Sequence, residues 1–174
     1  MNRHGILLWG FAATLILTTL LRGSRGLGLT RMDIPFMLGT MVTPDRSRAK
    51  VAGFGMHLCF GWLFASIYAL YFDALGLTSG WLGAAMGLFH GTFVLTVLLP
   101  LLPGLHPRMV SDFAGPEPTR QLEPPGFLGL NYGYQTPLAT LLAHLAYGMI
   151  LGAFYRPRLA GRPALRPVAT PERR

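Results

Sequence analysis

The side chains with the clearest chemical potential are histidines that stand in long apolar segments without Asp, Glu, Lys or Arg. Two of them begin the same pattern: a glycine follows the histidine after four residues, a small residue after four more, and a tyrosine after a further three. An ionisable side chain in such a segment indicates a functional site, because its removal from water must be offset by a partner. The two copies of the pattern are His57, Gly61, Ala65, Tyr68 and His144, Gly148, Gly152, Tyr155.

Neutral imidazole binds transition metals and haem iron, so we expect His57 and His144 to form a pair that binds a metal or haem. A haem would take both as axial ligands and lie against Gly61 and Gly148, whereas a bare ion needs a third or fourth ligand. The alternative is structural, with each histidine hydrogen-bonded to a facing threonine, tyrosine or carbonyl group. The candidate ligands are His57, His144, His90 and His106, and the candidate supporting residues are Gly61, Gly148, Tyr68, Tyr155 and Arg108.

A basic cluster, Arg46, Arg48 and Lys50, comes directly before the segment that contains His57. The cluster is a candidate site for lipid head groups, because basic side chains next to a membrane attract anionic lipids. The simpler interpretation is an ordinary basic flank of a membrane helix.

Four segments are long and apolar enough to position these side chains inside a bilayer. The hydrocarbon core of a bilayer is about 30 Å thick and needs about 20 apolar residues in a helix. Segments 5–21, 51–72, 81–102 and 137–155 meet this requirement and lack Asp, Glu, Lys and Arg. Small residues recur every four positions in each segment, which predicts the faces on which the helices touch and places His57 and His144 on those faces.

The two histidine patterns also predict an internal repeat, with units of about 5–72 and 81–155. Gly10 in the first unit matches Gly91 in the second, and the loop glycine Gly39 matches Gly129. Two units of two spans each enter the membrane in the same direction, so we expect parallel helix-loop-helix repeats with both long loops on one side. The predicted fold class is all-α integral membrane, with four transmembrane helices in one domain over 1–155 and a disordered Arg- and Pro-rich tail over 156–174.

The composition of the whole chain agrees with a membrane protein. Of 174 residues, 51% are hydrophobic and only 13% are charged, which is too apolar for an ordinary soluble domain. Fifteen Lys and Arg against seven Asp and Glu give a net charge of +8. In so apolar a chain this excess indicates contact with membrane lipids and not with nucleic acid. The single cysteine, Cys59, excludes an intramolecular disulfide framework.

The chain resembles a family of small four-span bacterial inner-membrane proteins of unknown function. The resemblance rests on GTMVTPDRSRA at 39–49, the two histidine spans, HPRM at 106–109 and LEPPGFLGLNYG at 122–133. It implies a multi-pass inner-membrane protein and assigns no catalytic residue. Because the spans lack a nucleophile with an acid–base partner, we expect a non-enzymatic role as a binding module or as a subunit with a membrane-protein partner or a second copy. A small transporter or channel for an ion or solute is the alternative.

Overall fold

The computed structural model describes residues 1–111 and 122–157, and within these ranges it is helical and contains no strand. Four helical segments are long and apolar enough to cross a membrane: 3–26, 46–75, 80–105 and 136–154. They coincide with the four predicted segments: the first three extend further at both ends, and the fourth is shifted by one residue. The predicted tail covers 156–174, and all of it after residue 157 lies outside the described residues.

The first half of the chain comprises three helices: α1 (Arg3–Gly26), the short α2 (Ile34–Val42) and α3 (Arg46–Leu75). Each begins at a side-chain cap, which satisfies a backbone N–H that has no partner within the helix. Asn2 accepts from the N–H of Gly5, Asp33 from that of Phe36, and Asp45 from that of Arg48. Polar caps between apolar runs therefore set where each helix enters the bundle.

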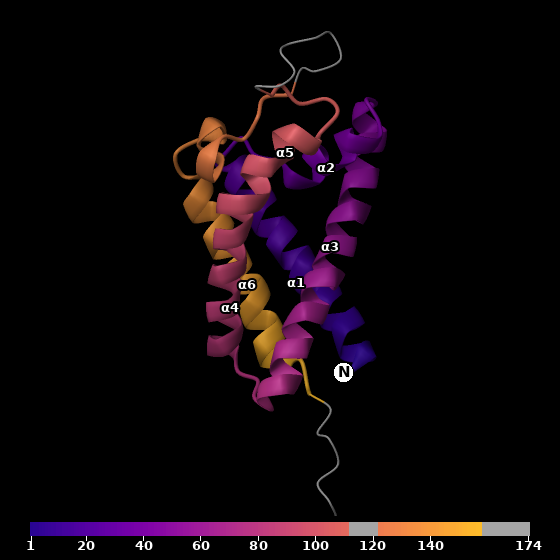
Figure 1. Cartoon of the computed structure of the whole chain (residues 1–174), viewed down its shortest axis with the longest axis vertical. Helices are drawn as coiled ribbons and strands as arrows, with labels where there is room; N and C mark the ends of the chain where they lie inside the picture. The colour runs from indigo at the N-terminus through magenta and orange to yellow at the C-terminus, as the bar shows by residue number, and fades with distance from the viewer. Residues whose placement is uncertain (112–121, 158–174) are drawn as a thin grey trace, which may run out of the picture.

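The second half begins with α4 (Gly80–Phe93), which continues without a break through a π-helical turn, η1 (Val94–Leu98), into α5 (Leu99–Leu105). A 3-10 segment, η2 (Phe127–Tyr132), then precedes α6 (Thr136–Phe154). In Figure 1, α2 and α5 lie near one another at the upper end of the bundle, and the turn between α3 and α4 lies at the lower end. The described parts of both long connections therefore lie at one end, as predicted.

Two helix contacts are close enough to exclude any side chain. A Cβ atom on Gly83 or Gly148 would overlap the other residue's carbonyl oxygen, so α4 and α6 touch through their backbones. The same holds between α2 and α3, where a Cβ on Gly39 would overlap the carbonyl of Ala49. In a bilayer, glycines allow this approach, and dispersion contacts then hold the helices together.

The two long connections differ in local structure, although their sequences are similar. Gly39 lies inside the regular helix α2, whereas Gly129 has a φ of 72° in η2 next to Leu128 at 56°. A left-handed φ suits glycine, and Leu128 is an uncommon exception. The similarity between the loops therefore does not extend to their backbone conformation.

Candidate functional site

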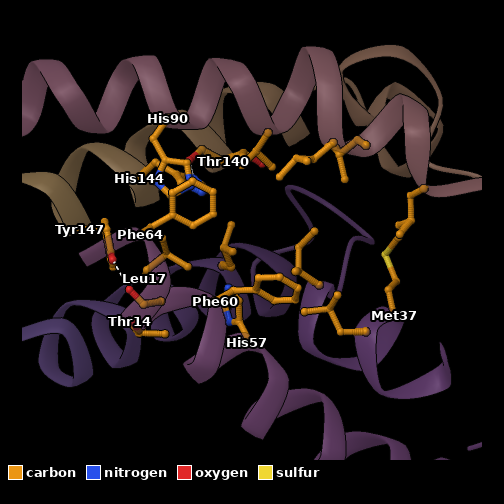
Figure 2. Close-up of a pocket in the computed structure, with 18 of the residues that line it drawn as sticks. Thr14, Leu17, Met37, His57, Phe60, Phe64, His90, Thr140, His144 and Tyr147 are labelled. Carbon is orange, nitrogen blue, oxygen red and sulfur yellow. Dashed lines mark hydrogen bonds between the residues drawn. The ribbon is translucent and has the colours of Figure 1, made fainter. Parts of the chain in front are cut away.

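A cavity of about 270 Å³ lies between the two halves of the molecule, and all six α-helices in the described part of the chain contribute to its wall. Its lining is mostly leucine, phenylalanine, methionine and other apolar side chains. The polar side chains in the wall are Thr14, His57, His90, Thr140, His144 and Tyr147. Figure 2 shows His90 and His144 together on one wall and His57 apart from them, with the aromatic side chains of Phe60 and Phe64 in the same cavity. The two predicted histidine helices therefore contribute to one cavity.

His57 is fixed from α1. Its Nδ1 lies 3.0 Å from the hydroxyl of Thr18, which donates its own hydrogen to the carbonyl of Thr14 at 2.7 Å. Because that hydroxyl has only one hydrogen, Nδ1 of His57 must be the donor in this pair. The neutral ring then carries its lone pair on Nε2.

His144 adopts the same tautomer through a different partner. Its Nδ1 lies 2.8 Å from the carbonyl oxygen of Thr140, one turn earlier in α6. A carbonyl can only accept, so Nδ1 of the neutral ring carries the hydrogen and Nε2 is again the acceptor. The two matching histidines thus present the same nitrogen as an acceptor.

His90 packs among aromatic rings. Its ring stacks on Phe64 at 3.8 Å between centroids and stands edge-on to His144 at 4.7 Å. The side chain is 9% exposed, and its Nδ1 has no hydrogen-bond partner. Buried polar atoms without a partner are rare in proteins and costly, so this nitrogen needs an explanation.

Two more unpartnered atoms lie close to His90. Across the described residues, three buried side-chain nitrogen or oxygen atoms lack a partner: Nδ1 of His90, the hydroxyl of Tyr68 and Oγ1 of Thr140. His90 and Thr140 line the cavity, and the ring of Tyr68 lies edge-on to His90 at 6.1 Å. All three therefore belong to one region, at or beside the cavity.

At Gly61 and Gly148, where a porphyrin was predicted to lie, neighbouring helices are in close contact. A Cβ on Gly61 would overlap the hydroxyl of Thr14, and one on Gly148 would overlap the carbonyl of Gly83. These glycines are where neighbouring helices touch, so their small size is already used for packing. Within 1–111 and 122–157, no group of three or more His, Cys, Asp or Glu side chains is placed to hold a metal ion. The described residues therefore lend no support to a metal or haem centre at His57 and His144, which stays a prediction.

His106 is not part of the cavity lining. Its Nε2 lies 2.9 Å from the carbonyl of Met37 in α2, and its Nδ1 accepts from the backbone N–H of Arg108 at 3.1 Å. Both ring nitrogens are thus committed to the protein. Burial is the main cause that lowers the pKa of His106. Arg108 donates to the carbonyls of Thr40 and Met41 at the end of α2. Together they join α5 to α2 and are not ligands.

Tyr155 also lies away from the cavity, although its sequence position matches that of Tyr68. Its hydroxyl donates to Asp73 at 3.0 Å and accepts from the backbone N–H of Asn2 at 3.1 Å. It therefore links the ends of α1, α3 and α6 at the opposite end of the bundle. The lipid-head-group candidates Arg46, Arg48 and Lys50 are all exposed in the first turns of α3.

The π-helical turn η1 was not predicted from the sequence. The N–H of Leu99 bonds to the carbonyl of Val94, five residues earlier, and Val94 and Leu98 line the cavity. Pro100, the next residue, has no N–H to continue the regular α-helical pattern. π-helical turns are frequent at functional sites, and a proline inside a predicted span is a signal for a local departure from regular α-helix.

No protein-family model matches the chain, and the comparisons with curated proteins and with solved structures found no match.

Proposed function

We propose that the protein is a non-enzymatic membrane binding module, and that its cavity holds a small, mostly apolar molecule taken from the bilayer. The observation that carries this proposal is the clustering of the three unpartnered buried atoms at or beside the cavity. An unsatisfied buried polar atom costs about 1–3 kcal/mol, so a molecule that pairs with it gains this stabilisation on binding. Binding sites for small molecules commonly combine apolar walls with a few polar groups in this way.

The position of the cavity mouth supports entry from the lipid. Phe60, Leu98 and Leu101 line the cavity and are 43%, 40% and 55% exposed. Phe60 lies in the second candidate span and the two leucines in the third. Residues that belong to a span and remain exposed face the hydrocarbon region, so the mouth opens sideways between α3 and the segment formed by η1 and α5.

The charge of the wall favours this function over an ion channel or ion transporter. The polar side chains of the described lining are threonines, histidines and a tyrosine, with no Asp, Glu, Lys or Arg. Ion pathways are commonly built from charged rings or rows of carbonyl oxygens. A neutral molecule suits the wall better, because a neutral molecule loses less hydration when it enters an apolar site.

We place the protein in the bacterial inner membrane, with its halves as two parallel repeats. The helix contacts support the repeat, because matching positions meet in both halves. In the first half Gly10 contacts Ala65, and in the second half Gly83 contacts Gly152. One end of each contact also matches: Thr18 meets His57, and Gly91 meets His144. These contacts favour Gly83, not Gly91, as the counterpart of Gly10.

Cysteine labelling in intact cells and in inverted vesicles tests this placement, with Cys59→Ala as background. Ser47→Cys and Ser111→Cys should label from one side and Ser79→Cys from the other. Labelling of positions 47 and 111 from opposite sides would contradict the topology.

Binding is tested in phosphatidylcholine nanodiscs loaded with 4-octylphenol or 4-octylanisole, two apolar probes with one polar end. Bound probe should raise the Tm of the wild type by mass action. Leu98→Trp, which fills the mouth, should abolish the rise. Leu88→Trp is the matched control, because Leu88 is 41% exposed in the same span and is not part of the lining. The proposal fails if neither probe raises the Tm, or if Leu98→Trp changes nothing.

A further inference from the structure

The hydrogen-bonding state of the cavity wall restricts the chemistry of its ligand. Tyr147 donates its hydroxyl hydrogen to the carbonyl of Gly61 at 2.6 Å, and Thr14 donates to the carbonyl of Gly10 at 2.7 Å. The hydrogens of these two side chains are therefore not available to a ligand. The remaining polar side chains of the wall are His57, His90, Thr140 and His144.

Two of these four groups can act only as acceptors toward a ligand. The Nδ1 hydrogens of His57 and His144 are given to Thr18 and to the carbonyl of Thr140. Each neutral ring then has only its Nε2 lone pair for another molecule, and a lone pair must be met by a donor. A ketone, an ester carbonyl or an ether has no hydrogen to give and leaves both histidines unpaired.

The wall that carries His144 also offers groups of the complementary kind. Oγ1 of Thr140 and Nδ1 of His90 have no protein partner. A threonine hydroxyl both donates and accepts, and a neutral imidazole nitrogen does one or the other. A ligand atom that donates to Nε2 of His144 and accepts from Thr140 or His90 would satisfy this wall, and a hydroxyl group does both.

We infer that the cavity selects a neutral, lipid-soluble molecule with a hydroxyl group, an alcohol or a phenol, whose hydroxyl donates to Nε2 of His144. This inference rests on the proposed function and narrows it to one class of ligand. The apolar part of the molecule lies along the leucines of η1 and α5 toward the mouth. Molecules that only accept hydrogen bonds bind less tightly, because they leave the acceptor nitrogen unpaired in an apolar cavity.

The same two probes separate the inference from the proposed function, because 4-octylanisole is 4-octylphenol with the hydroxyl hydrogen replaced by methyl. Histidine-ring 15N NMR of the whole chain in phosphatidylcholine nanodiscs reports the tautomer of each histidine and the effect of each probe. One hydrogen bond contributes about 1 kcal/mol, so the phenol should bind about five- to tenfold tighter than the ether. The Nε2 signal of His144 should shift with the phenol and much less with the ether.

His144→Phe keeps a ring of similar size and removes the acceptor, so the preference for the phenol should disappear. His57→Phe is the matched variant and should retain it. If His144→Phe does not fold, the NMR titration of the wild type still decides. Equal binding of both probes, tighter binding of the ether, or a protonated Nε2 on His144 would overturn the inference and leave the proposed function standing. Failure of both probes to bind would overturn the proposed function itself.

Discussion

In the second half of the molecule α4 and α6 touch through backbone atoms, whereas in the first half α1 and α3 touch through side chains. Gly83 and Gly148 leave no space between them for a side chain. In the equivalent position of the first half, Gly61 receives the side chain of Thr14, and Thr18 reaches His57. The same spacing of small residues therefore produces a backbone contact in the second half and a contact through polar side chains in the first.

This difference explains how one cavity can form between similar halves. Backbone contact along α4 and α6 makes that pair the closer of the two. The first pair is held further apart by threonine side chains, and those side chains fix a histidine at the cavity wall. A small residue in a membrane helix thus marks a contact face, but the residue opposite decides what the contact does.

Gly148→Ala should have the largest effect, because it disrupts the backbone contact between α4 and α6. The new methyl group would overlap the carbonyl of Gly83, and backbone atoms cannot move aside without separating the helices. We expect a loss of at least about 3 kcal/mol in the free energy of unfolding, measured by thermal and denaturant unfolding in nanodiscs. Gly55→Ala is the control, because a Cβ there meets nothing within 4 Å. Equal effects of the two variants would contradict the backbone contact between α4 and α6.

Gly61→Ala should cost less and should be rescued from the other helix. Its methyl group would meet the side chain of Thr14, which can be shortened. We expect a cost of about 1–3 kcal/mol, and Thr14→Ala in the same chain should recover part of it. A double-mutant cycle on unfolding free energies measures this coupling. Additive effects would show that the two residues do not meet.

Thr18→Val tests the polar contact alone, since valine has nearly the shape of threonine without the hydroxyl. It leaves the Nδ1 hydrogen of His57 without its acceptor, and we expect a loss of about 1–2 kcal/mol. Thr92→Val is the matched control, because the Thr92 hydroxyl bonds only within its own helix and is exposed. The 15N NMR signals of His57 should shift in the first variant and not in the second.

The smallest effect should come from the link between the halves at His106. Burial lowers the pKa of His106 in the folded state, whereas in the unfolded chain His106 has its ordinary pKa of about 6.5. As the pH falls below about 6.5, the unfolded chain therefore takes up this proton before the folded protein does. Stability is then fully present above about pH 6.5 and falls as the pH decreases toward the folded pKa. Tm measured between pH 7.5 and 5 should fall less steeply in His106→Gln. An unchanged slope would show that His106 does not contribute.

The four spans and their contact faces were predictable because both depend on local sequence. Length and apolarity are enough to identify a span, and the spacing of Gly10, Gly61 and Gly148 identified their faces. The helix α2 and its contact between Gly39 and Gly53 were not predicted, since a nine-residue apolar helix in a long connection has no distinct periodic signal.

The site was only partly predictable for a related reason. His57, His90 and His144 do line one cavity, but their partners depend on helix packing that one sequence does not reveal. The glycines beside the histidines were interpreted as space for a cofactor and are instead filled by Thr14 and by the backbone of α4. His106 and Tyr155 were predicted to belong to the site, and the fold places them at opposite ends of the bundle.

The π-helical turn changes the direction in which the later side chains of one continuous helix point around its axis. A regular α-helix advances about 100° per residue, and a π-helical turn accommodates one extra residue without breaking the axis. Before the turn, α4 presents Gly83 and Gly87 to α6, and after it, Leu102 and Leu105 line the cavity. If residues 94–98 formed a regular α-helix without losing a residue, every later side chain would lie about 100° further around the axis relative to α6. The wider turn therefore sets which side chains of η1 and α5 face the cavity that His90 of α4 also lines.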